Sequence, residues 1–232
     1  MLRATRPTDV PRERLVRSWF ENAEAWTRAV RDGLIESRRL ATDEAVVAAL
    51  LESEPGRVLD VGCGEGWLCR TLSARGIEAV GIDVSRPLVD AARAAGGGRF
   101  EAMAYEDLAD AAPSLGRFDA VACNFALLDE DLAPLLQAVR SLLAPGGRLV
   151  VQTVHPWGAC GEEPYRDGWR LETFEGFGAQ VFPEAMPWYF RTLASWQAAL
   201  ATAGFAVQAL REPSHPETGR PLSLLMVCTP GG

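Results

Sequence analysis

The sequence predicts an α/β fold, a three-layer sandwich in which helices cover both faces of a mostly parallel β-sheet. Short apolar runs typical of buried strands alternate with helical patterns between Arg57 and His155. A glycine-rich turn, GCGEG at 62–66, directly follows the first of these runs. Such a turn allows a tight strand-to-helix connection and a close approach to the backbone.

The region before the first strand predicts a loose arm followed by helices. Residues 1–18 contain two prolines and mixed charges, which favour an irregular arm. Apolar residues then recur at helical spacing from Ser18 to Leu51, with an interruption at Gly33. Thr42 or Asp43 is the expected N-cap of the last helix in this region.

The central region supplies five predicted strands. These strands cover 57–62, 78–85, 99–104, 118–128 and 148–155. The helical patterns between them lie at 65–76, 86–98 and 131–147, and each of them ends in glycine. Consecutive strands joined by helices predict parallel pairing.

The alternation stops after His155. Residues 156–190 are rich in glycine, proline and aromatic side chains, and an irregular stretch of this length is typical of a lid or binding loop. A helix is expected at 193–205, and two final strands at 206–213 and 222–229. We therefore expect a helical cap at 1–52, a core at 53–155, a lid at 156–190 and a C-terminal helix with a strand hairpin at 191–232, all within one domain.

Composition restricts the function classes. The formal net charge is −8, and all 23 basic residues are arginines, so neither nucleic-acid binding nor lysine chemistry is expected. The five cysteines form no CxxC pair, which argues against a disulfide framework and a metal site. Without an apolar signal or membrane segment, a cytoplasmic protein is expected.

The glycine loop and one acidic residue point to an adenosine ligand. The loop departs from the dinucleotide pattern GxGxxG, because the bulky Trp67 occupies the third glycine position. Asp83 ends the second strand, 21 residues after Gly62, a spacing that suits a carboxylate accepting hydrogen bonds from ribose hydroxyls. These features disfavour an NAD(P)-linked oxidoreductase but leave it open as an alternative.

Four sequence blocks resemble one family in order and spacing. VLDVGCGEG, GIDVS, FDAVACNFALL and LAPGGRLVVQT are similar to the corresponding blocks of class I S-adenosylmethionine-dependent methyltransferases of the small-molecule type. The resemblance implies a Rossmann-like seven-stranded sheet with an antiparallel last strand. It also implies S-adenosylmethionine as cofactor and S-adenosylhomocysteine as product. A non-catalytic S-adenosylmethionine-binding protein remains an alternative.

The resemblance implies a set of cofactor-binding positions. The loop residues would surround the methionine and ribose parts, Asp83 would bind the ribose, and Val84 would lie against the adenine. Tyr105 and Glu106 stand where an adenine contact is usual, although Ala104 replaces the acidic residue found there in the family. Asn124 would lie beside the methionine part, and Trp26 and Arg39 are candidates from the N-terminal helices. The complete set is Asp60, Gly62, Cys63, Gly64, Gly66, Asp83, Val84, Tyr105, Glu106, Asn124, Trp26 and Arg39.

The acceptor side has its own candidates. His155 ends the fifth predicted strand and is the candidate general base; a histidine bonded within a turn is the alternative. Tyr165, Trp169 and Trp188 are the expected substrate-binding aromatics, and they compete with a role in a small lid core. Arg191 is interpreted as a surface ion-pair residue. The acceptor is expected to be a small molecule, methylated at oxygen, nitrogen or carbon.

Overall fold

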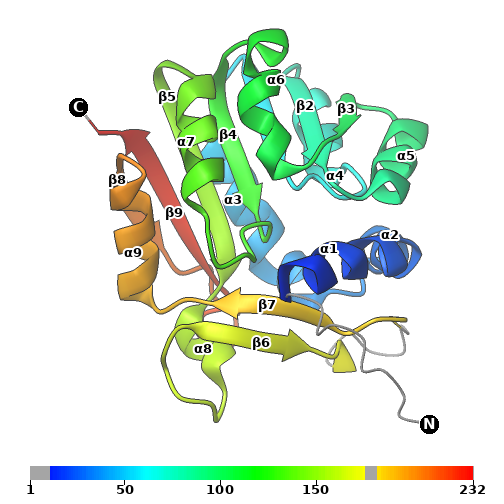
Figure 1. Ribbon diagram of the computed structural model, residues 1–232, viewed down its shortest axis with the longest axis vertical. Coiled ribbons are helices and arrows are strands. Elements are labelled where there is room, and N and C mark those ends of the chain that lie inside the picture. Colours follow the sequence, from blue (N-terminus) through cyan, green and yellow to red (C-terminus); the bar gives the residue numbers. More distant parts are fainter. Residues whose placement is uncertain (1–10, 176–181, 232) are drawn as a thin grey trace, which may run out of the picture.

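The computed structural model describes residues 11–175 and 182–231. Its main feature is a seven-stranded sheet in the order β3-β2-β1-β4-β5-β9-β8 (Figure 1). The sheet strands are β1 (Arg57–Val61), β2 (Glu78–Asp83), β3 (Arg99–Ala102), β4 (Phe118–Asn124), β5 (Leu143–Val154), β8 (Phe205–Arg211) and β9 (Ser223–Pro230). Strands β1 to β5 pair in parallel, whereas β9 is antiparallel to both β5 and β8. The expected seven-stranded sheet with its antiparallel last strand is therefore confirmed.

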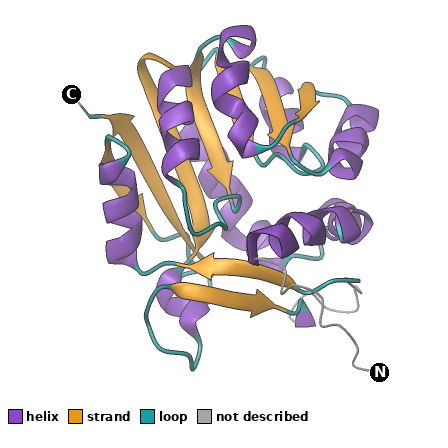
Figure 2. Ribbon diagram, viewed as in Figure 1, coloured by secondary structure: helices purple, strands orange, loops and turns teal. Residues whose placement is uncertain are grey.

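Helices cover both faces of this sheet, as Figure 2 shows. The helices are α1 (Pro11–Glu21), α2 (Ala23–Arg31), η1 (Arg38–Thr42), α3 (Asp43–Leu51), α4 (Trp67–Ser73), α5 (Arg86–Ala95), η2 (Tyr105–Asp107), α6 (Leu108–Leu115), α7 (Ala133–Leu142), α8 (Pro156–Cys160) and α9 (Leu193–Thr202). Side chains of α6, α7 and α9 pack on one face of the sheet in a single apolar cluster. Those of α3, α4 and α5 form the cluster on the other face. Burial of these two clusters is the main source of stability.

The N-terminal region differs from the sequence prediction. The arm expected at residues 1–18 is helical from Pro11 onward, because α1 buries Leu15 and Ser18. Residues 1–10 lie outside the described residues. A π-helical turn, η1, precedes α3, and Thr42 does not cap α3 with its side chain. Between β3 and β4, where no helix was expected, the chain forms η2 and α6.

The segment expected to be an irregular lid contains regular structure. Strands β6 (Gly168–Glu172) and β7 (Met186–Phe190) form an antiparallel hairpin separate from the main sheet. Figure 1 shows this hairpin next to α1, below the carboxyl end of β4. Leu15 of α1, Phe174 and Met186 form a third apolar cluster between the hairpin and the N-terminal helices. The two segments thus support each other over one edge of the sheet.

None of the helices in the two described ranges has the length and apolar character required to span a membrane.

Candidate active site

A cavity of about 320 Å³ lies at the carboxyl ends of the parallel strands. Its floor comes from the loops after β1, β2, β3 and β4, and its cover comes from α1, α2, η1 and the β6–β7 hairpin. In open parallel sheets, ligands bind at this edge, where the strand order reverses. Here that reversal falls between β1 and β4.

The glycine loop joins β1 to α4 and forms part of the cavity floor. The N–H groups of Gly62 and Cys63 both donate to the carbonyl of Ile82, at 2.8 and 2.9 Å, which fixes the loop against β2. Gly62 has φ of +76°, and a Cβ there would lie 2.5 Å from the Cβ of Ala126. A Cβ on Gly64 would meet no atom within 4 Å. The loop therefore leaves open space over its middle glycine, as close approach of a ligand requires.

Gly66 and Asp60 support the structure of the glycine loop but do not line the cavity. Gly66 is the left-handed residue before α4, and a Cβ there would lie 2.9 Å from the Cβ of Ala92. Asp60 is buried beneath the loop, and the Cys69 thiol donates weakly to it over 3.8 Å. Burial first, and then the charge of Asp83, raise the pKa of Asp60 to about 7.

Asp83 lines the cavity at the end of β2. Its Oδ2 accepts a hydrogen bond from the Gly64 N–H at 2.9 Å, and its Oδ1 accepts one from the Ser85 N–H at 2.8 Å. Burial raises the pKa of Asp83 to about 6, although both backbone hydrogen bonds act in the opposite direction. Because each carboxylate oxygen accepts more than one bond, Asp83 keeps acceptor capacity for a ligand with paired hydroxyls.

Most of the other predicted cofactor residues also meet at this cavity. The lining includes Cys63, Val84, Tyr105, Glu106, Asn124 and Trp26. Asn124 Oδ1 accepts a hydrogen bond from Gln152 Nε2 at 2.7 Å, which fixes the orientation of its amide. Burial raises the pKa of the Cys63 thiol well above its usual range, so Cys63 does not supply a thiolate.

Arg39 lies elsewhere, and its neighbour Arg38 lines the cavity in its place. Arg39 packs its side chain toward Gly33. The Arg38 Nε donates to Asp43 at 2.9 Å, and its guanidinium carbon lies 4.5 Å from the ring centroid of Trp67. Arg38 is therefore a cation of fixed position at this end of the cavity, and a ligand carboxylate bound here would contact it.

His155 does not line the cavity. It precedes α8, and its Nε2 lies 2.7 Å from Oε1 of Glu212, which follows β8. Its side chain is 13% exposed. The expectation of a general base at the cavity edge is therefore corrected. The imidazole pairs with Glu212, 57 residues further along the chain, and does not face the cavity.

Of the three aromatics proposed for the acceptor, only Trp188 lines the cavity. Tyr165 Oη accepts a hydrogen bond from the Leu193 N–H, and Trp169 Nε1 donates to Glu130. Tyr165 therefore contacts the start of α9 and Trp169 the loop after β4, and neither residue lines the cavity. Phe177, one of the aromatic residues of the expected lid at 156–190, lies outside the described residues.

Several lining residues were not expected from the sequence. They include Arg12, Trp19, Glu65, Asp129, Glu172, Phe174 and Met186. Arg12 of α1 forms ion pairs with Glu106 and Asp129. Arg191 is not a surface residue: it is 4% exposed and donates to the backbone carbonyls of Asp129 and Glu130. The buried guanidinium of Arg191 thus fixes the position of the loop that carries Asp129.

Comparison with known proteins identifies the family of this site. The family model described as "Methyltransferase domain" matches residues 35–210, well over half of the chain. The chain belongs to this methyltransferase family. The expectation of a class I S-adenosylmethionine-dependent methyltransferase is confirmed, and with it the cofactor class read from the glycine loop.

Individual relatives resemble parts of this methyltransferase or its fold. It is 38% identical over 116 residues to a ubiquinone biosynthesis O-methyltransferase of Xanthomonas axonopodis pv. citri; the match covers 47% of each chain. The chain therefore matches about half the length of such relatives. A methyltransferase structure from Mesorhizobium loti is 27% identical, with a TM-score of 0.60 over 80% of this chain and 95% of that one. The 1,6-didemethyltoxoflavin-N1-methyltransferase of Burkholderia thailandensis shares the fold, at 20% identity and a TM-score of 0.63 over 99% and 94% of the two chains.

Proposed function

We propose that this protein transfers the methyl group of S-adenosylmethionine to a small-molecule acceptor. The observation that carries the proposal is the position of Asp83. Its carboxylate lies beside the uncovered backbone of Gly64 and in the same cavity as Asn124 and Arg38. When bound, S-adenosylmethionine supplies an electrophilic methyl group on a sulfonium sulfur.

The residues present fit this cofactor. Asp83 would bind the ribose hydroxyls, Val84 would contact the adenine, and Arg38 would pair with the methionine carboxylate. Asn124 and the loop backbone would contact the amino acid part between them. The open space over Gly64 is the cradle that such a ligand needs, because a side chain there would enter it.

The acceptor would be small and largely apolar. Trp19, Trp26, Phe174, Met186 and Trp188 form an apolar wall under the cap and hairpin. Such a wall excludes water and orients an acceptor, which is the main requirement of an in-line methyl transfer. Glu172 and Asp129 are the carboxylates of this half, and they are better placed than His155 to receive a proton.

The parts of the chain have different roles in this proposal. We propose that the cap at 1–52 and the insertion at 156–190 enclose the ligands, while 53–155 binds the cofactor. The cytoplasmic location stays a prediction from the sequence, as does the identity of the methylated atom. The named relatives methylate oxygen in one case and N1 in the other, so they do not choose between these atoms.

Calorimetric titration with S-adenosylhomocysteine, with NAD as the matched control, tests the proposal. Binding of S-adenosylhomocysteine at micromolar strength without binding of NAD is the expected result. Incubation with S-adenosylmethionine and a panel of aromatic hydroxyl and amine compounds would then yield S-adenosylhomocysteine. Binding of NAD alone would refute the proposal, and cofactor binding without any turnover across broad panels would favour a non-catalytic binding protein.

A further inference from the structure

Glu65 is a buried acidic residue inside the glycine loop itself. Its side chain is 2% exposed, and it also lines the cavity. Cofactor contact does not require a carboxylate at this loop position, because the neighbouring glycines contribute backbone. A buried carboxylate is unfavourable unless it is paired, so its partners indicate what it does.

Two guanidinium groups from different parts of the chain hold Glu65. The Arg70 Nη2 lies 2.7 and 2.6 Å from the two carboxylate oxygens, and its Nη1 donates to the Glu65 carbonyl at 2.6 Å. Arg70 is on α4, which the loop itself begins, so this contact is local. The second partner, Arg31, donates from its Nε to Glu65 Oε2 at 2.8 Å.

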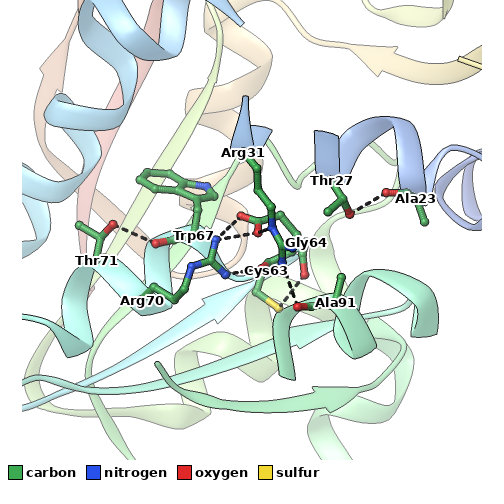
Figure 3. Close-up of polar contacts among 10 residues, drawn as sticks. Ala23, Thr27, Arg31, Cys63, Gly64, Trp67, Arg70, Thr71 and Ala91 are labelled. Carbon is green, nitrogen blue, oxygen red and sulfur yellow. Dashed lines mark hydrogen bonds and ion pairs between the residues drawn. The ribbon is translucent and has the colours of Figure 1, made fainter. Parts of the chain in front are cut away.

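Arg31 connects three elements. It comes from the last turn of α2 in the N-terminal cap, and its Nη2 also donates to the carbonyl of Ala91 on α5, at 3.0 Å. Figure 3 shows Arg31 and Arg70 converging beside Cys63 and Gly64, one from the cap and the other from the core. The cap therefore contacts the cofactor loop through a charged pair in addition to apolar packing.

The two partners differ in how easily they separate from Glu65. Arg70 is 27% exposed and doubly bonded, whereas Arg31 is 40% exposed and reaches the carboxylate from the surface. A displacement of α2 would carry Arg31 with it and leave Arg70 on the helix that follows the loop. Glu65 would then keep one cation instead of two, and the loop would lose its ionic contact with the cap.

We propose that Arg31 and Glu65 are positioning residues that couple closure of the cap to the shape of the glycine loop. This inference rests on the proposed function for its ligand. With the cap closed, Arg31 holds the loop in its ligand-binding shape and slows release of the cofactor. With the cap open, the loop relaxes and the cofactor exchanges.

The first test compares Arg31→Ala with Arg28→Ala. Arg28 lies one turn earlier on the same helix and pairs only weakly, at 3.7 Å, with Glu24 of that helix. We expect Arg31→Ala to weaken S-adenosylhomocysteine binding by about tenfold, mainly through a faster dissociation rate in stopped-flow tryptophan fluorescence, and Arg28→Ala to stay within about twofold. Arg31→Lys, which keeps the charge without the planar fork, should fall between wild type and Arg31→Ala.

The second test is a double-mutant cycle with Glu65→Gln. If the pair acts as a unit, the double variant binds S-adenosylhomocysteine about as weakly as Glu65→Gln alone. Additive losses would overturn the coupling. So would an Arg31→Ala variant with a lower Tm but unchanged affinity and dissociation rate, since that result marks a purely structural residue.

Hydrogen exchange on the ligand-free protein separates this inference from the proposed function. Arg31→Ala should increase exchange of the backbone amides of the glycine loop, and Arg28→Ala should not. This readout needs no cofactor. Failure of the wild-type protein to bind S-adenosylhomocysteine would therefore contradict the methyltransferase proposal, while unchanged loop exchange in Arg31→Ala would contradict the coupling.

Discussion

Asp83 connects the recognition of a ligand to the shape of the loop that surrounds it. Its two oxygens accept the N–H groups of Gly64 and Ser85, so the same carboxylate that faces the cavity also fixes the glycine loop. Ser85 in turn donates from its hydroxyl to the carbonyl of Trp19 in the cap, at 3.0 Å. A change at Asp83 should consequently affect cofactor contact and loop geometry together.

Asp83→Ala tests this double role. We expect it to weaken S-adenosylhomocysteine binding by about 1.5–3 kcal/mol, because charge-assisted hydrogen bonds to two hydroxyls are lost. Calorimetry measures the effect, with Asp90→Ala as the control, since Asp90 is an exposed acid on the neighbouring helix α5. Affinity equal to that of the control would remove Asp83 from the site.

Asp60 makes the stability of the ligand-free protein depend on pH. Its folded pKa of about 7 lies above the ordinary value of 3.8, so the folded state binds the proton more tightly than the unfolded state. The stabilisation of the folded state that results from the raised pKa is fully present below about pH 4. It is lost as the pH rises through about 7. Asp60→Asn should therefore flatten the fall of the unfolding free energy between these values.

Urea denaturation of Asp60→Asn and wild type at several pH values measures this difference. The pH dependence of the unfolding free energy that remains in the variant comes from the other acidic residues. One of them is Asp83, whose pKa is also raised, to about 6. Parallel profiles for the two proteins would show that Asp60 ionises normally in the folded state.

One reciprocal hydrogen-bonded contact joins the N-terminal helices to the segment just before β7, in addition to the apolar cluster between them. Asn22, which is fully buried between α1 and α2, donates from Nδ2 to the Glu184 carbonyl at 2.7 Å and accepts from the Glu184 N–H at 3.0 Å. A buried side chain of the cap therefore pairs with both backbone groups of Glu184, which are partly buried. The association of cap and hairpin is expected to depend strongly on this one side chain.

Asn22→Ala should loosen the hairpin without unfolding the sheet. The loss of both hydrogen bonds to the partly buried backbone of Glu184 costs about 1–2 kcal/mol. Hydrogen exchange should rise in β6 and β7 and stay unchanged in β1 and β4. Uniform changes across the whole protein would contradict a local role.

Local sequence patterns identified the elements whose position follows from the sheet. The glycine loop, Asp83 and Asn124 stand at strand ends, and parallel strands bring their ends to one edge, so the sequence placed them together correctly. The part of α1 before Ser18 and the hairpin were missed because their stability comes from the mutual packing of Leu15, Phe174 and Met186, which are far apart in the chain.

Side-chain direction was harder to predict than element position. The π-helical turn η1 adds a residue to the turn, and Arg38 rather than Arg39 reaches the cavity. His155 stands at the expected strand end, but its imidazole pairs with Glu212, a contact that no local pattern encodes. Arg191 likewise looked exposed because its partners are backbone carbonyls rather than acids.

Across the complete fold, the cavity is enclosed by parts that belong to different regions of the chain. The core supplies the floor, the cap supplies α1 and α2, and the hairpin closes the remaining side. Arg12 on α1 connects the cap to two core loops, through Glu106 after β3 and Asp129 after β4. Because Arg12 is 47% exposed, each pair is worth about 1 kcal/mol or less and is screened by salt.

Arg12 should therefore make cofactor release sensitive to ionic strength. In the wild-type protein, raising the salt from about 0.05 to 0.5 M is expected to increase the S-adenosylhomocysteine dissociation rate by roughly threefold, since screening weakens the Arg12 pairs that close the cap. Arg12→Ala should release the ligand faster at low salt and show little further change with added salt. Arg75→Ala, which alters an exposed arginine at the end of α4, should keep the wild-type salt dependence. If Arg12→Ala keeps it as well, the salt effect arises elsewhere, and the two Arg12 pairs do not hold the cap over the cavity.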